Sequence, residues 1–137
     1  EQAESALAAE SFDLLVLDAF SSDAIPVHLL TKEAFDVYAR HLNTNSLIAI
    51  NISNHFLDLQ PVVLNLAQKF GYKLASIDYE ETDEEWWFYG STWVLLSRDG
   101  GIINSPPIRN AASTLRANSA GVPLWTDDFA SLFQILR

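Results

Sequence analysis

Cysteine and methionine are both absent from this sequence of 137 residues. Without cysteine the chain has no disulfide, no thiolate nucleophile and no Cys-ligated zinc site. No apolar run reaches the roughly 18 residues that a membrane-spanning helix needs, and no signal peptide opens the chain. We therefore expect no membrane partner and a cytoplasmic location.

Basic residues are also scarce, because Lys and Arg total 8 against 18 Asp and Glu and the formal net charge is -10. This balance repels a phosphate backbone, so no nucleic-acid partner is expected. The negative charge instead favours a small cationic amine such as a polyamine as a partner. The three histidines (His28, His41 and His55) show no metal-ligand spacing, so no metal site is expected.

Glycine is rare, and the five glycines form neither a GxGxxG nor a Walker pattern. No GxSxG elbow is present either, so hydrolase chemistry has no support. If the protein is an enzyme, the site that holds the phosphate or nucleoside of a cofactor is not expected on this chain.

The apolar fraction of 49% is typical of a packed domain, and its distribution predicts regular elements. Strands are expected over residues 12–17, 46–50, 72–79 and 91–98, and helices over 31–42, 58–70 and 127–136. Thr31 is a candidate N-cap, Pro61 suits a first helical turn, and Gly71 suits the position after a helix C-terminus. Turns are expected at 43–45 and 99–101.

Alternation of strands and helices predicts the α/β class with flanking helices. No helix separates the last two strands, so they should pair antiparallel in an otherwise mostly parallel, mixed sheet. The first strand has apolar residues that indicate burial on both faces. It has no partner upstream in the chain, so its edge should be covered or paired, for example in a homodimer.

Ligands of open α/β sheets bind beyond the carboxyl ends of the strands, which directs attention to Asp18, Asp23, Asn51 and Ser53. A carboxylate there can hold a cation or accept a proton from an amine. On spacing alone a solvated strand end is favoured for the two aspartates, and Asx-type turns are favoured for Asn51 and Ser53.

The most unusual segment is residues 78–89, where six acids and five aromatic residues lie together. Carboxylates beside aromatic faces attract ammonium groups, each contact contributing about 1 kcal/mol when partly exposed. Asp78, Trp87 and Tyr89 are therefore candidate substrate-binding residues. A solvated hairpin whose aromatic residues lean on the core explains the segment equally well.

Several motifs occur together in order: Phe12–Asp18, Ser21-Ser22-Asp23, Gly71-Tyr72 and Leu124-Trp125-Thr126-Asp127-Asp128-Phe129. With them the chain resembles the C-terminal half of the spermidine synthase-like family, aminopropyltransferases on an S-adenosylmethionine-dependent methyltransferase-like Rossmann fold. The last motif is similar to the Thr-Asp-Asp-Tyr signature of bacterial members. The resemblance covers nearly the whole chain, which implies a single partial domain, 1–137, without the cofactor-binding half.

This resemblance implies transfer of an aminopropyl group from decarboxylated S-adenosylmethionine to a diamine such as putrescine. Asp23 matches the catalytic base, and Asp18 matches the acid near the adenine and amine sites. Asn51 or Ser53 falls where the family places a polar cleft residue, and Trp87 falls near its substrate-contacting Tyr. Because the Gly-rich half is missing, the isolated chain is expected to be inactive and not to bind the co-substrate alone.

The sequence also departs from the family pattern. The compact Asp-Ser-Ser-Asp-Pro motif is a longer loop here, with Pro26 displaced, and Tyr-Pro-Ser-Gly becomes Trp87-Phe88-Tyr89-Gly90. Two other functions therefore stay open: a non-catalytic module that binds polyamines or a protein, and a methyltransferase that uses S-adenosylmethionine itself.

Overall fold

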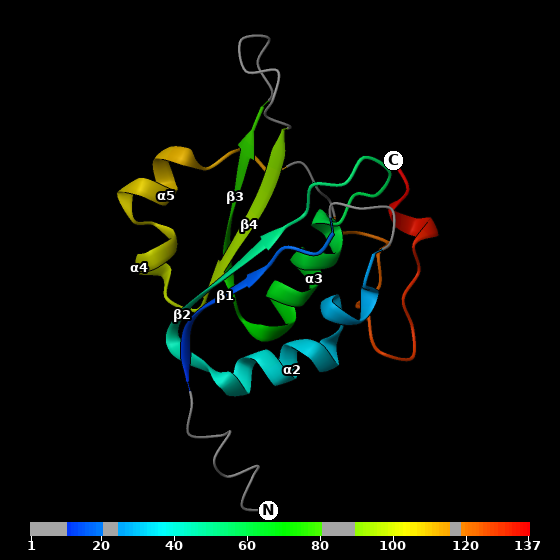
Figure 1. Cartoon of the computed structure of the whole chain (residues 1–137), viewed down its shortest axis with the longest axis horizontal. Helices are drawn as coiled ribbons and strands as arrows, with labels where there is room; N and C mark the ends of the chain where they lie inside the picture. Colours follow the sequence, from blue (N-terminus) through cyan, green and yellow to red (C-terminus); the bar gives the residue numbers. More distant parts are fainter. Residues whose placement is uncertain (1–10, 21–24, 81–89, 116–118) are drawn as a thin grey trace, which may run out of the picture.

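Four strands form one mixed sheet in the computed structural model, which describes residues 11–20, 25–80, 90–115 and 119–137 (Figure 1). They are β1 (Phe12–Leu17), β2 (Leu42–Asn51), β3 (Lys73–Tyr79) and β4 (Ser91–Ser97), in the order β1-β2-β4-β3. β1 and β2 are parallel, and β4 lies antiparallel between β2 and β3. The α/β class, the mixed sheet and the antiparallel last strand are confirmed.

Helices lie on both sides of this sheet (Figure 1). The described helices are η1 (Val27–Leu30), α2 (Lys32–His41), α3 (Gln60–Phe70), α4 (Gly100–Ile103), α5 (Pro106–Ala111) and η2 (Phe133–Ile135). α2 and α3 cover one face, and α4 packs against β3 and β4 from the other. In the described ranges no helix is long and apolar enough to cross a bilayer.

The core lies between the sheet and the pair α2 and α3. Ile48 and Ile50 of β2 are paired with Leu96 and Val94 of β4, and all four side chains are buried on the face toward these helices. The helices supply fully buried apolar side chains to the same cluster: Phe35, Val62, Val63 and Leu66. Burial of each large side chain contributes about 1.5–3 kcal/mol, which fixes the helices on this face.

The predicted helix ends are confirmed. The Thr31 hydroxyl caps α2 by accepting a hydrogen bond from the Ala34 N–H at 3.2 Å. Pro61 lies in the first turn of α3. Gly71 ends α3 with φ 72°, a left-handed conformation that favours glycine because it has no Cβ.

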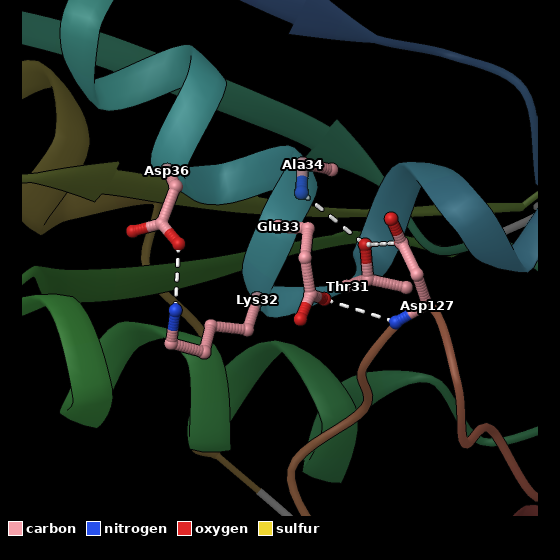
Figure 2. A network of polar contacts seen from close by, with 6 residues as sticks. All are labelled: Thr31, Lys32, Glu33, Ala34, Asp36 and Asp127. Atoms are coloured by element: carbon pink, nitrogen blue, oxygen red, sulfur yellow. Dashed lines mark hydrogen bonds and ion pairs between the residues drawn. The ribbon is translucent and has the colours of Figure 1, made fainter.

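The motif at residues 124–129 packs onto the start of α2 (Figure 2). The Lys32 N–H donates to the carbonyl of the fully buried Trp125 at 2.8 Å. The Thr31 hydroxyl donates to the Asp127 carboxylate at 2.7 Å, and the Asp127 N–H donates to the Glu33 carboxylate at 2.9 Å. Three hydrogen bonds therefore join this late segment to the first turn of an early helix.

β1 is not buried on both faces, so that prediction is wrong. Phe12, Leu14 and Val16 are 53%, 55% and 51% exposed, whereas Leu17 on the opposite face is buried. β1 lies at the edge of the sheet, and α4 packs against β3 and β4 at the far edge. Nothing in the described part of the chain covers the outer face of β1.

Both predicted turns are also corrected. Residues 43–45 lie inside β2, which starts at Leu42. The pairing register with β1 shifts there, since Phe12 pairs with Leu42 whereas Leu14 pairs with Leu47. The turn-like residues thus form an irregularity within a longer strand. Asp99 caps the short helix α4 through a hydrogen bond from the Gly101 N–H at 2.8 Å.

The closing helix predicted over 127–136 is absent, because among these residues only η2 (Phe133–Ile135) is helical. Thr126 and Phe129 exchange backbone hydrogen bonds of 2.9 and 3.1 Å and close a tight turn instead. Further along, Leu136 pairs with Leu57 in an antiparallel bridge. The backbone groups that a helix would use are therefore committed to a turn and to another segment.

Candidate functional site

The candidate site lies where β1, β2 and β3 end and β4 begins. These three strands run in the same direction and β4 runs against them. The C-terminal ends of β1, β2 and β3 and the start of β4 therefore lie at the same end of the sheet. Asp18 follows β1, Asn51 closes β2, and Asp78 lies at the end of β3 beside Thr92 of β4. Ligands of open α/β sheets bind at this edge, as expected.

A chain of hydrogen bonds connects three of these strand ends. The Asn51 side-chain amide donates to the Asp18 carboxylate at 2.8 Å. The Asn51 side-chain oxygen accepts from the Ser53 N–H at 3.0 Å and from its hydroxyl at 2.5 Å. The Ser53 oxygen in turn accepts from the Thr92 N–H at 2.8 Å. Asp18 is exposed, and the hydrogen bond from Asn51 orients its carboxylate.

Asn54 organises the loops around this chain. Its side-chain amide donates to the carbonyl of Phe20 at 2.9 Å, and its side-chain oxygen accepts from the N–H groups of Phe56 and Leu57 at 2.9 Å. Phe20 is fully buried in the core. The start of the loop after β1 is therefore anchored by a buried ring and by a buried amide.

A cleft of about 440 Å³ opens next to the hydrogen-bonded chain. Its lining is mostly polar: Ile52, Asp58, Gln60, Asp78, Tyr79, Glu80, Gly90, Ser91, Thr92 and Arg137. Thr92 belongs both to this lining and to the chain that starts at Asp18. The volume lies within the range of small-molecule sites, although such sites are usually more apolar.

Three carboxylates and one guanidinium give the cleft a net negative charge. Asp58, Asp78 and Glu80 supply the carboxylates, and Arg137 supplies the guanidinium. Across the described residues, no three acidic or histidine side chains converge as a metal site requires. The three carboxylates outnumber the single guanidinium, so the lining favours a cation over an anion.

The site residues predicted from the sequence have different outcomes. Asp18, Asn51 and Ser53 are brought into contact, and Asp78 lines the adjacent cleft. Three others lie outside the described residues: Asp23, Trp87 and Tyr89.

Sequence reasoning did not identify Asp58 or Arg137 as site residues. Asp58 follows β2 closely, so its position after a strand end was an available signal. Arg137 has no local signal, because it reaches the cleft only through pairing of residues 135–137 with 56–58.

Comparison with known proteins assigns no family. No protein-family model matches the chain, and no curated protein matches its sequence. A function is therefore argued from the sequence motifs and from the geometry of the site.

Proposed function

We propose that this chain is the C-terminal part of a spermidine synthase-like aminopropyltransferase and that its acidic cleft is the amine site. The observation that carries the proposal is the position of Asp78 in an acidic cleft that adjoins the chain Asp18–Asn51–Ser53–Thr92. These residues come from four different strand ends, and the resemblance places site residues at Asp18 and at either Asn51 or Ser53.

Electrostatics support an amine as the ligand. The cleft carries three carboxylates against one guanidinium, and the whole chain has a formal net charge of -10. A dication such as putrescine is attracted by this field, which raises its local concentration and its association rate. Carboxylates that line a partly enclosed cleft are also screened less than those on an open surface.

The arrangement of the sheet is a further support. Three strands run one way, and the last strand is inserted antiparallel between the second and the third. In the proposed parent protein this sheet is the C-terminal half of a methyltransferase-like Rossmann sheet. The exposed edge of β1 is then where the half that holds decarboxylated S-adenosylmethionine packs.

The proposed reaction is attack of a primary amine on the methylene carbon next to a sulfonium. The new N–C bond forms as the C–S bond breaks, and methylthioadenosine leaves with the bonding electrons. The amine nitrogen loses one proton, for which Asp23 is the expected acceptor. Asp78 holds the distant ammonium group, and Asn51 orients the Asp18 carboxylate, so that catalysis comes mainly from positioning.

Calorimetric titration of the chain with putrescine tests the amine site. We expect wild-type protein to bind putrescine, and Asp78→Asn to weaken binding about fivefold, which corresponds to one ammonium–carboxylate contact of about 1 kcal/mol. Asp128→Asn is the matched control, because Asp128 is exposed and lies outside the cleft. Methylthioadenosine alone should not bind. Equal putrescine binding by all three proteins would reject the proposed site.

A second candidate function is favoured by one observation, the half-exposed apolar side chains Phe12, Leu14 and Val16 on β1. Such a surface fits a non-catalytic module that binds a protein partner or a second copy of the chain. This function predicts association through β1 without any amine binding in the cleft.

A further inference from the structure

Arg137 is brought into the cleft by pairing between two distant segments. The Asp58 N–H donates to the Ile135 carbonyl at 2.7 Å, and the Arg137 N–H donates to the Phe56 carbonyl at 3.0 Å. Leu57 and Leu136 lie between these bonds and form an antiparallel bridge. The backbone on which Arg137 is mounted is therefore held beside Asp58.

Within the described residues, the guanidinium does not neutralise the acidic side chains of the cleft. Among the residues that the structure describes, the only ion pair joins Lys32 and Asp36, and neither residue lines the cleft. Arg137 therefore makes no ion pair with Asp58, Asp78 or Glu80 there. The cleft lining contains one guanidinium and three carboxylates, of which the Asp58 carboxylate also accepts a hydrogen bond from the Gln60 N–H at 3.2 Å.

The number of carboxylates in the cleft favours a ligand with more than one ammonium group. The carboxylates line one cleft, yet no three acidic side chains of the described chain converge on a single point. The three carboxylates can accept hydrogen bonds from two ammonium groups of one organic ligand. A guanidinium donates two parallel hydrogen bonds to a carboxylate. A simple diamine has no carboxylate and therefore cannot accept them.

We propose that the cleft takes a diamino acid, which carries two ammonium groups and one carboxylate, in preference to the simple diamine. This inference rests on the proposed amine site and specifies its substrate class. The ammonium groups face the carboxylates of Asp58, Asp78 and Glu80, and the ligand carboxylate pairs with Arg137. The cleft volume of about 440 Å³ accommodates a ligand of this size.

Ornithine and putrescine are a matched pair of probes, because they differ only by the carboxylate. In calorimetric titrations of the full 137-residue chain, we expect ornithine to bind about tenfold more tightly than putrescine. Arg137→Gln should abolish this difference and strengthen putrescine binding, because a like charge is removed from the cleft. Arg137 is exposed, so the substitution should not disturb folding, which circular dichroism checks.

Arg109→Gln is the control, because Arg109 is an exposed arginine on α5 outside the cleft, and it should retain the tenfold preference. Equal affinity of the wild-type chain for the two ligands would overturn the inference and leave the amine site standing. A preference for ornithine that survives Arg137→Gln would overturn it as well. Absence of binding by both ligands would reject the amine site together with the inference.

Discussion

At the scale of single residues, Asn51 connects the ends of β1 and β2 in the candidate site. It is 9% exposed and uses both ends of its amide, donating to Asp18 and accepting from Ser53. Removal of a buried hydrogen-bonding group leaves its partners without their bonds, which is more costly than the loss of one exposed bond.

We expect Asn51→Ala to lower the free energy of unfolding by about 1–3 kcal/mol and to weaken putrescine binding. Asn43→Ala is the matched control, because Asn43 also lies on β2 and donates to an aspartate, Asp13, but is exposed. Its effect should stay within about 0.5 kcal/mol. Urea unfolding of the three proteins measures both values, and equal losses would contradict the role assigned to Asn51.

Tyr38 makes the stability of the folded chain depend on pH. Burial raises the pKa of its phenol above the ordinary value of 10.0, and its hydroxyl donates to the Leu29 carbonyl at 3.0 Å. Burial also raises the pKa of Tyr72, against an opposing effect of the Arg98 guanidinium. Since the folded-state pKa lies above the unfolded one, this contribution to stability is complete below about pH 10 and is lost as the pH rises further.

The free energy of unfolding should therefore stay unchanged up to about pH 10 and decline at higher pH, and the decline should be smaller in Tyr38→Phe. The variant should also be about 1 kcal/mol less stable at the lower pH, because its hydrogen bond to Leu29 is missing. Tyr79→Phe serves as control, since Tyr79 is 45% exposed. Identical pH profiles for the wild type and Tyr38→Phe would show that Tyr38 does not cause the decline.

At the scale of elements, the contact between the 124–129 segment and α2 gives the two neighbouring aspartates different roles (Figure 2). Asp127 accepts from Thr31 at the N-terminus of α2, where a negative charge also interacts favourably with the helix dipole. Asp128 is exposed, and no hydrogen bond of its side chain is found in the described structure.

Asp127→Ala should lower the unfolding free energy by about 1 kcal/mol, through the lost hydrogen bond and the lost charge at the helix N-terminus. Asp128→Ala should change it by less than about 0.5 kcal/mol. Thermal unfolding of the two variants under identical conditions measures the difference. A larger loss in Asp128→Ala than in Asp127→Ala would mean that the second aspartate has the structural role.

At the scale of the whole molecule, the sheet has one edge that is open and apolar. β3 at the other edge is covered in part, since the Ser113 N–H donates to the Ser76 carbonyl at 2.7 Å. β1 has no such cover in the described chain, and its outward side chains are half exposed. An uncovered strand of this kind pairs readily with another strand.

We expect the chain to self-associate in sedimentation experiments as its concentration rises, and Leu14→Glu to shift the distribution toward monomer. Leu14 is 55% exposed, so the substitution should change monomer stability little. Gln134→Glu adds the same charge at an exposed polar position and should leave association unchanged. A monomeric wild-type chain at every concentration would remove the edge strand from any role in self-association.

Much of the fold is predictable because local interactions specify it. Thr31 caps the start of α2 and Gly71 caps the end of α3, each through a hydrogen bond to a residue about one turn away. The sequence nearby is therefore sufficient to identify both caps. The closing helix is predicted wrongly for the opposite reason. Its helical spacing of apolar residues is real, but Leu136 pairs with the distant Leu57, and tertiary pairing prevails over local propensity.

The candidate site is predictable to the extent that it follows strand ends. Asp18, Asn51 and Ser53 come directly after apolar strands that run in the same direction, so their meeting at one edge is implied by the strand pattern. The other part of the site is not implied. Asp58 and Arg137 are 79 residues apart in the numbering and share a cleft only because their segments pair.

The sequence by itself thus determines the α/β class, the start of α2, the end of α3 and the acidic character of the chain, since these depend on composition and on neighbours along the chain. Only the tertiary structure decides the strand order, the exposure of β1 and the presence of Arg137 among the carboxylates. Each of these depends on which distant segments pack together, and the free energy of such packing is summed over many weak contacts that no short stretch of sequence contains.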